Sequence, residues 1–222
     1  MADSRVLFLD EVTSTQDAAV ELNLQFGDAC VSYNQTAGRG RRGNQWNANG
    51  GVAVTVVIEE LTAHLPIALA ATLAAQLNNC IPEQRVGIKW PNDLFVEGKK
   101  IAGILIEQRE GRCLVGVGVN VLESPIPTAT CLKECGAEIS VSVVADLAIA
   151  SVFDAVQLGE DTAVSQWRKR DVLVGTTQRV RSGDNTFEGI VLSIDPCNNL
   201  ILETADAILE LPAATSTIVT LF

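Results

Sequence analysis

The chain has 222 residues, of which 47% are hydrophobic, and its formal net charge is -11 at pH 7. This length predicts one domain, or one large domain with a small companion, and the apolar content predicts a sizeable core. The acidic balance disfavours a general nucleic-acid or membrane-surface binder, whose footprint would be basic. The apolar run near the N-terminus is short and ends in acids, and no long uncharged apolar run follows it. We therefore expect a cytoplasmic protein without a membrane segment.

The first three quarters of the chain predict an α+β domain. The β-branched run at residues 52–58 is typical of a buried strand, and the Ala/Leu-rich run at 65–77 is typical of a buried helix. Ser14 is a good N-cap for a helix of about ten residues, with Asp17 in its first turn. Further strands are expected at residues 6–9, 29–33, 86–90, 94–96, 101–107 and 113–121, and further helices at 143–157 and 162–168.

After Asp171 the pattern changes to short strands separated by Gly, Asp, Asn or Pro turns. This spacing predicts a small β-barrel of about fifty residues. Its strands are expected at residues 172–174, 177–181, 186–194, 200–203 and 207–211. The sequence thus predicts two domains, residues 1–172 and 173–222.

A loop at residues 35–46, with the sequence QTAGRGRRGNQW, concentrates three arginines and three glycines within six positions. Glycine lets the backbone approach a ligand closely, and arginine has a planar fork that suits carboxylate or phosphate. By itself such a loop can also be a solvated basic segment or a fragment like an RNA-binding tail. Against this alternative, the repeat does not continue, and Trp46 is followed closely by an apolar strand. We expect the loop to order over a small anion.

Three further segments complement the loop. In KWPND, residues 89–93, Lys89 ends a strand and Asn92 offers an amide, although turn closure explains Asn92–Asp93 equally well. Lys100 opens an apolar strand in which Gly103 leaves room for a ligand, with a β-bulge as the alternative explanation. In GVGVN, residues 116–120, alternate glycines predict a slot along the sheet. Six of the sixteen Lys and Arg residues lie in residues 39–42 and 89–100. Together the segments predict a site for several negative charges.

The six cysteines form no CxxC pair, and the single histidine, His64, precedes a helix. We therefore expect free thiols, a surface or capping role for His64, no protein-built metal site and no nucleophilic triad.

The five motifs together resemble those of the biotin–protein ligases. Ser14-Thr15, GRGRRGNQW, KWPNDL, KIAGILIE and GVGVN appear in the order that this family has, along nearly the whole chain. The resemblance implies a mixed β-sheet catalytic domain flanked by helices, like the class II synthetases, and a small SH3-like β-barrel after it. It also implies the monofunctional type, which lacks an N-terminal DNA-binding domain.

The resemblance further implies the reaction and its partners. Family members activate biotin with ATP to biotinyl-5′-AMP and then transfer biotin to a lysine of a biotin carboxyl carrier domain. ATP and Mg²⁺ are therefore expected as co-substrate and metal, biotin as substrate and the carrier domain of a carboxylase as protein partner. A homodimer is compatible with the family, and neither DNA nor a membrane is an expected partner.

The resemblance assigns residue roles by motif position. Lys100 and Arg41 are expected to be catalytic by stabilising developing charge. Biotin is expected to contact Ser14, Thr15, Gln16, Gln35, Gly38, Arg39, Gly40, Arg41, Lys100, Gly103, Gly116 and Gly118. ATP is expected to contact Arg41, Trp46, Asn92, Lys100 and Asn120, with Trp46 packing near adenine.

Two positions depart from the family pattern. Asn44 stands where relatives commonly have another arginine, and Gln16 stands where asparagine is frequent. Two other readings stay open on sequence grounds, a lipoate or octanoate ligase and a non-catalytic biotin sensor. A transcriptional repressor is disfavoured because no DNA-binding module is expected.

Overall fold

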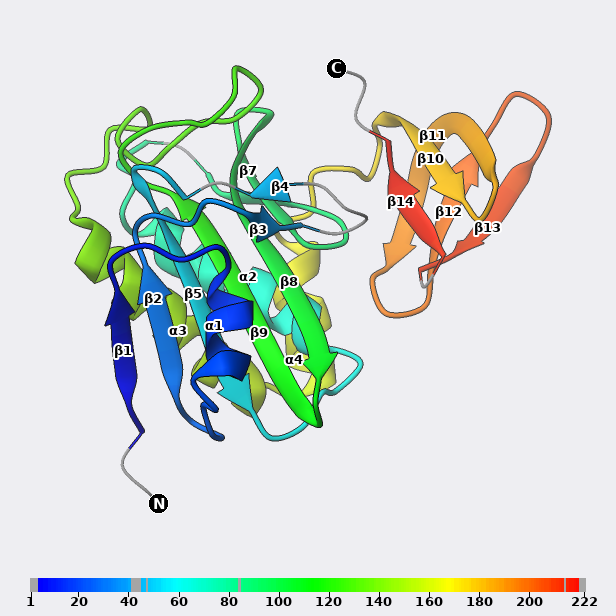
Figure 1. Cartoon of the computed structure of the whole chain (residues 1–222). Helices are drawn as coiled ribbons and strands as arrows, with labels where there is room; N and C mark the ends of the chain where they lie inside the picture. Colours follow the sequence, from blue (N-terminus) through cyan, green and yellow to red (C-terminus); the bar gives the residue numbers. More distant parts are fainter. Residues whose placement is uncertain (1–3, 41–44, 47, 84, 214, 220–222) are drawn as a thin grey trace.

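The computed structural model describes residues 4–40, 45–46, 48–83, 85–213 and 215–219. Its larger part is a seven-stranded mixed sheet with the strand order β1-β2-β5-β9-β8-β7-β6 (Figure 1). β1 and β2 are parallel, and the other neighbours in this sheet are antiparallel. The strands are β1 (Val6–Leu9), β2 (Ala29–Ser32), β5 (Gly51–Ile58), β6 (Gly87–Lys89), β7 (Asp93–Val96), β8 (Lys99–Arg109) and β9 (Arg112–Asn120).

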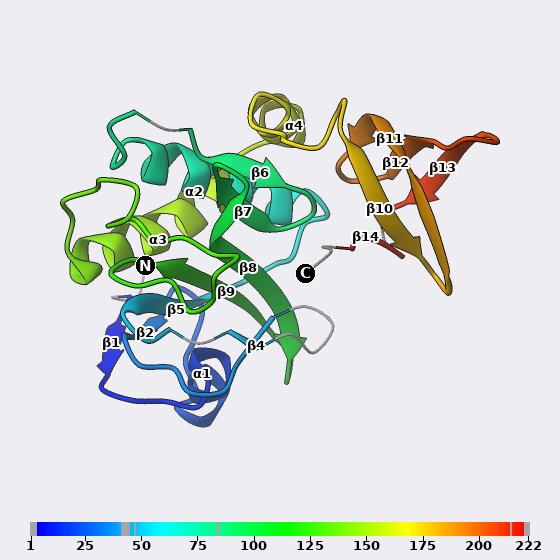
Figure 2. The ribbon, with the colours of Figure 1, turned by 90° about the horizontal axis from the view of Figure 1, so that it is seen from above.

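Helices cover both faces of this sheet. Figure 2 shows α2, α3 and α4 on one face and α1 on the other. All eight residues of β5 are buried because helices pack against both of its sides. α2 is apolar nearly all round and buries nine residues, as expected for a core helix. The helices are α1 (Thr15–Glu21), α2 (Leu65–Asn78), α3 (Val141–Gln157) and α4 (Glu160–Arg168).

The predicted α+β class and most predicted elements are confirmed. The clearest difference in this part is α1, which has seven residues instead of about ten. Ser14 does occupy the N-cap position, but its side chain makes no capping hydrogen bond. His64 likewise precedes α2 without capping it, and its Nε2 lies 3.0 Å from the carbonyl oxygen of Leu158.

Two short strands flank the Gly-Arg loop. β3 (Gly38–Arg39) and β4 (Gln45–Trp46) pair antiparallel, with Gly38 opposite Trp46. A Cβ atom at position 38 would lie 2.3 Å from the Trp46 carbonyl oxygen, so this close pairing requires glycine. The predictions for Arg41 and Asn44 fall outside the described residues.

The C-terminal part is a five-stranded antiparallel sheet in the order β13-β12-β11-β10-β14. The register joins no residue of β13 to β14 within the described ranges, so the closed barrel stays a prediction. The strand β14 was not predicted from the sequence. The strands are β10 (Thr177–Ser182), β11 (Asn185–Asp195), β12 (Asn199–Glu203), β13 (Ile208–Pro212) and β14 (Ser216–Ile218).

The predicted strand at residues 172–174 is wrong. The Asp171 carboxylate accepts hydrogen bonds from the backbone N–H groups of Leu173 and Val174, which turns the chain at this point. Backbone groups on either side of Asp171 pair instead with β6: Ile88 N–H donates to the Arg170 carbonyl, and Val172 N–H donates to the Ile88 carbonyl. We call residues 169–176 the connector. The predicted domain boundary near residue 172 falls inside it and stays a prediction.

One apolar cluster runs through both parts of the molecule. It includes Val54 and Leu73 from the larger sheet and its helices, Leu173 from the connector, and Val180 and Leu202 from the C-terminal sheet. The two parts are therefore packed against a shared interior. In the described part of the chain, no helix is long and apolar enough to cross a membrane.

Candidate active site

The strand registers place one row of residues across the face of the larger sheet that carries α1. Opposed pairs link Ala53 to Gly118, Gly118 to Gly103, Gly103 to Asp93 and Asp93 to Lys89. Directly opposed residues point to the same face of a sheet. The row therefore has small residues at its centre and charged side chains at the β6 edge, and all five residues line one cleft. We call this row the floor of the cleft.

Side chains of α1 and Gln35 close the other end of the cleft. The side-chain oxygen Oε1 of Gln35 accepts from Thr15, at 2.8 Å from the backbone nitrogen and 3.2 Å from Oγ1. Thr55 Oγ1 donates to Thr15 Oγ1 at 2.9 Å, and Gln16 Nε2 donates to the Leu105 carbonyl at 2.9 Å. These polar groups are buried, so their positions are set before any ligand arrives. Thr15, Gln16 and Gln35 line the cleft together with Ser14, as predicted.

The indole of Trp46 lies on the floor. A Cβ atom at position 118 would be 2.2 Å from Trp46 Cε2, and one at position 103 would be 3.4 Å from Cζ3. The ring thus fills the space that the two glycines leave. Its Nε1 is buried and has no hydrogen-bond partner within the described residues. An unpaired buried donor costs about 1–3 kcal/mol, so the ring lies on the floor at the cost of one missing hydrogen bond.

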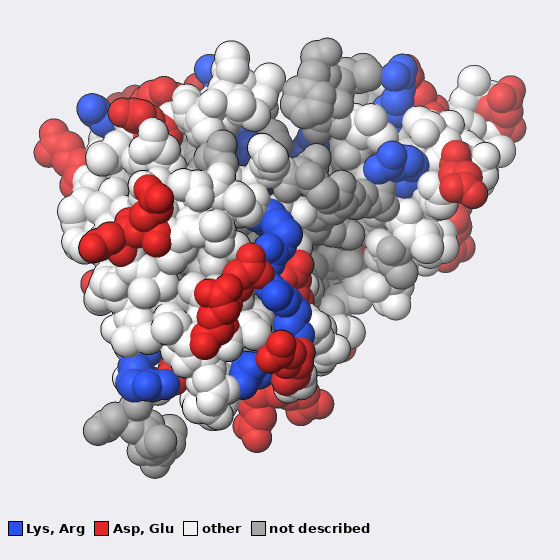
Figure 3. Space-filling view, in the orientation of Figure 1, with Lys and Arg blue, Asp and Glu red and all other residues white. Residues whose placement is uncertain are grey.

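Arg39 is held by carboxylates. Its guanidinium makes two hydrogen bonds to Asp17, at 2.7 and 2.9 Å, and one to Glu107 at 3.4 Å. Arg109 also pairs with Asp17. The hydrogen bond from Arg39, joined by that from Arg109, lowers the pKa of Asp17 to about 2. Basic and acidic side chains accordingly alternate on the face over α1 and β8 in Figure 3.

Lys100 faces the cleft at the start of β8. Its Nζ lies 2.6 Å from Asp93 Oδ1 and 5.2 Å from the centroid of the Trp46 ring. Lys89 lies at the same edge, with its Nζ 5.1 Å from the Phe95 ring centroid, and burial lowers the pKa of its ammonium group. Asp93 thus stands between two lysines. The sequence had favoured a turn for Asp93 over an indirect role at the site, because its pairing with Lys100 depends on the β7–β8 register.

The two asparagines assigned to ATP are bonded to the protein backbone. Asn92 Nδ2 donates to the Ile104 carbonyl, and Ile104 N–H donates back to the Asn92 carbonyl at 3.1 Å. Asn120 Nδ2 donates to the carbonyls of Thr130, at 3.0 Å, and Lys100, at 3.4 Å. Asn92 lines the cleft, but Asn120 is buried outside its lining. In this state Asn120 therefore fixes the backbone that carries Lys100.

Most of the predicted site residues come together in this cleft. The lining includes Ser14, Thr15, Gln16, Gln35, Arg39, Gly40, Trp46, Asn92, Lys100, Gly103, Gly116 and Gly118. Gly38 and Asn120 do not line it, and Arg41 lies outside the described residues.

Sequence reasoning missed the carboxylates that hold the cations and the contribution of the C-terminal sheet. Thr217 and Ile218 of β14 also line the cleft. No local motif marks the carboxylates or the two β14 residues, because the role of each depends on a contact with a distant segment of the chain. The six cysteines are free, and no group of three or more potential metal ligands occurs in the described ranges.

Comparisons with known proteins agree with this fold. The bifunctional ligase/repressor BirA of Bacillus subtilis is 28% identical over 94% of this chain and 72% of its own length. The biotin–[acetyl-CoA-carboxylase] ligase of Paracoccus denitrificans is 32% identical over 83% of this chain and 87% of its own. The structure of the biotin protein ligase from Aquifex aeolicus in complex with biotin and ATP superposes with a TM-score of 0.84 at 25% identity, covering 96% of this chain and 98% of that one. The model of the biotin/lipoate A/B protein ligase family matches residues 9–122. The chain belongs to this family.

Proposed function

We propose that this protein is an ATP-dependent biotin–protein ligase. In the first half-reaction the biotin carboxylate attacks the α-phosphorus of ATP, which forms biotinyl-5′-AMP and releases pyrophosphate. In the second, a lysine amine of a biotin carboxyl carrier domain attacks the acyl carbon, which forms an amide and releases AMP. Both steps join or separate charged groups, so catalysis depends on positioning and charge neutralisation.

The floor of the cleft is the observation that carries this proposal. Gly118 and Gly103 leave a narrow apolar slot, suited to a flat ring and an aliphatic chain. The row ends at Asp93 and Lys89, and Lys100 pairs with Asp93 there, so two lysines suited to carboxylate and phosphate lie at this end. Thr15, Gln16 and Gln35 present amide and hydroxyl groups at the opposite end, as a ureido group requires. One slot thus offers the three chemistries of biotin in the order in which biotin has them.

Lys100 and Arg39 are the cations that we assign to the reacting groups. Both are paired with protein carboxylates, Lys100 with Asp93 and Arg39 with Asp17. A pair of charges at contact gains about 4 kcal/mol near a protein surface but about 1 kcal/mol in bulk water. Substrate anions that enter the closed cleft therefore compete with Asp93 and Asp17 for these cations. Lys100 then stabilises the charge that develops on the carboxylate and the α-phosphate.

Mg²⁺ fits this site as a companion of ATP. Mg²⁺ usually keeps several waters and takes one or two carboxylates together with substrate phosphates. Asp93 is the carboxylate among the described residues of the cleft lining, and it lies beside Lys100 and Lys89. Asp93 would hold the metal, which would offset phosphate charge when bound. The protein itself still orients the substrates and provides two cations for the phosphates, Lys100 and Lys89.

The wider expectations remain proposals. They are a homodimer, a cytoplasmic location and the absence of DNA and membrane partners. Arg41 remains a proposed catalytic residue on the strength of its motif position.

The deciding experiment measures pyrophosphate release from MgATP with biotin and, separately, with lipoate. We expect release with biotin and little with lipoate; release with lipoate alone would contradict the proposal. The second half uses a biotin carboxyl carrier domain and detects biotinylation by mass spectrometry, with the same domain lacking its target lysine as control. Tight binding of biotin without pyrophosphate release or carrier labelling would identify a sensor instead.

A further inference from the structure

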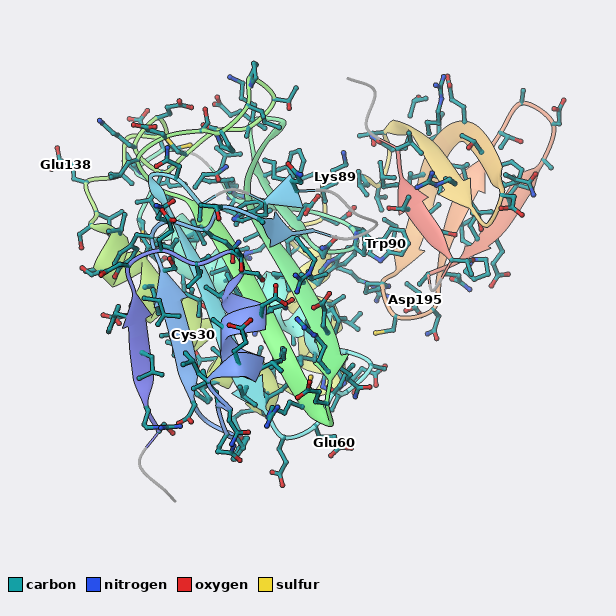
Figure 4. The ribbon with its side chains drawn as sticks, viewed as in Figure 1. Cys30, Glu60, Lys89, Trp90, Glu138 and Asp195 are labelled. Atoms are coloured by element: carbon teal, nitrogen blue, oxygen red, sulfur yellow. The ribbon has the colours of Figure 1, made fainter. Side chains whose placement is uncertain are left out.

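Trp90 lies where the larger sheet meets the C-terminal sheet. It follows β6, is 1% exposed, and donates a hydrogen bond from Nε1 to the Pro196 carbonyl at 3.2 Å. Pro196 belongs to the turn between β11 and β12. Figure 4 labels Trp90 and Asp195 on the two sides of this junction. The residues just after Trp90, Pro91 and Asn92, line the cleft. Trp90 therefore contacts the C-terminal sheet and is continuous with the site.

A second attachment lies two residues earlier in the chain. Ile88 pairs with the connector, donating to Arg170 at 2.7 Å and accepting from Val172 at 3.2 Å. A Cβ atom at Gly87 would be 2.2 Å from Val172 Cγ1, so the connector packs directly on β6. Trp90 thus holds the β11–β12 turn of the C-terminal sheet, and β6 holds the connector that leads into that sheet. Both attachments are at the edge of the larger sheet that ends the floor of the cleft.

The C-terminal sheet contributes part of the cleft wall. Thr217 and Ile218 of β14 line the cleft together with Lys89 and Asn92. β14 belongs to the same hydrogen-bonded sheet as the β11–β12 turn that Trp90 holds. The position of β14 over the β6 edge consequently depends on the two attachments. The charged lysines at that edge make it the half of the cleft suited to the phosphates of a nucleotide.

We propose that Trp90 is a positioning residue for the nucleotide half of the reaction. By holding Pro196, its indole N–H keeps β14 over the β6 edge of the cleft, so that Thr217 and Ile218 close the nucleotide side. This inference rests on the proposed ligase function, and it assigns to Trp90 a role without direct contact with substrate. Its loss should change the Michaelis constant for ATP more than the Michaelis constant for biotin.

Trp90→Phe tests this role, because it removes the N–H group and keeps an aromatic ring in the core. The matched control is Trp167→Phe: Trp167 is also fully buried, but its Nε1 has no partner within the described residues. We expect Trp90→Phe to raise KM for ATP about fivefold, the factor that one net hydrogen bond represents. KM for biotin should change less than twofold, and Trp167→Phe should change neither constant. Initial rates of pyrophosphate release give all four values.

Limited proteolysis supplies a readout that does not depend on activity. If Trp90 fixes the junction, Trp90→Phe should be cleaved in the connector faster than wild type, and Trp167→Phe should be cleaved at the wild-type rate. Equal ATP constants and equal cleavage rates for the two variants would overturn the inference. A wild-type protein that releases no pyrophosphate with biotin would refute the ligase function instead. In that case the proteolysis result would still decide the structural role of Trp90.

Gly87→Ala perturbs the second attachment and keeps the inference testable if Trp90→Phe does not fold. The added methyl group collides with the Val172 side chain and comes within 3.4 Å of the Arg170 carbonyl oxygen, so the packing of the connector on β6 is disturbed and KM for ATP should rise as it does in Trp90→Phe. Gly159→Ala is the control, because a Cβ atom there meets nothing within 4 Å. An unchanged KM for ATP in Gly87→Ala would contradict the two-point attachment.

Discussion

The floor of the cleft and its charged rim are built in different ways. The floor consists of opposed residues on β5, β9, β8, β7 and β6, and their positions are fixed by backbone hydrogen bonds. The rim consists of Arg39 and Lys100, and their positions are fixed by ion pairs with Asp17 and Asp93. The backbone of the floor can select a ligand by shape without rearranging, once the Trp46 ring has left the glycine slot. The cations of the rim have to release Asp17 and Asp93 before they can bind substrate anions. Mutations in the rim should therefore change the rate of adenylate formation and the pH dependence of stability.

Lys100→Ala should have the largest effect, because it removes the rim cation that we assign to the reacting groups. We expect the rate of biotinyl-5′-AMP formation to fall about 10²–10³-fold, as it does on loss of a preorganised electrostatic contact elsewhere. Single-turnover formation of the adenylate measures this rate. Lys99→Ala removes an exposed neighbouring lysine and should remain close to wild type. Equal activity of the two variants would remove Lys100 from the mechanism.

Gly118→Ala tests the floor. The added methyl group would lie 2.2 Å from the Trp46 ring and would narrow the slot. Overpacking of this kind costs about 1–3 kcal/mol, which corresponds to a rise in KM for biotin of about 5- to 150-fold. KM for ATP should change much less than KM for biotin. The urea midpoint of unfolding should stay close to the wild-type value, because the side chain of Trp46 can move away from the added methyl group. If KM for biotin stays at the wild-type value, biotin does not lie on this glycine.

Trp46→Ala separates the floor from the residue that covers it. The indole occupies the glycine slot and makes a cation–π contact with Lys100. A ligand in the slot has to displace the ring, and such a contact is worth about 0.5–1 kcal/mol at exposed sites. Without nucleotide, we expect biotin to bind Trp46→Ala about two- to fivefold tighter, measured by calorimetry. Weaker binding would mean that Trp46 contacts biotin directly.

Asp17→Asn should have the smallest effect, because exposed ion pairs contribute about 0.2–1 kcal/mol. The pKa of Asp17 in the folded protein is about 2, below its ordinary value of 3.8. Its ion pairs therefore stabilise the fold above about pH 4, and this contribution is lost as the pH falls towards 2. The unfolding free energies of wild type and Asp17→Asn should differ at pH 6 and converge near pH 2.

The control for this pH dependence is Glu21→Gln, which removes an exposed carboxylate from the last turn of the same helix. Denaturant unfolding followed by circular dichroism gives each free energy. A difference between wild type and Asp17→Asn that persisted at pH 2 would show that Asp17 acts through something other than its charge.

The sequence by itself determined the elements of the larger sheet and the residue types at the site. Hydrophobic period and turn residues are local signals, and they placed β5, α2 and the β8–β9 hairpin within two residues of their observed ends. The glycines, the two lysines and the Gly-Arg loop were visible for the same reason, since each lies in a short continuous motif.

Tertiary structure alone decided how these residues are paired. Asp17 pairs with Arg39 across 22 positions, and Trp90 reaches Pro196 across 106. Asp93 meets Lys100 across the β7–β8 pairing, whose register shifts between Leu94 and Phe95. The strand expected at residues 172–174 failed because Asp171 bends the chain there. Local sequence fixes backbone preference and side-chain chemistry. Contacts between distant segments form only when burial brings these segments together, and these contacts hold the cations and the C-terminal sheet at the cleft.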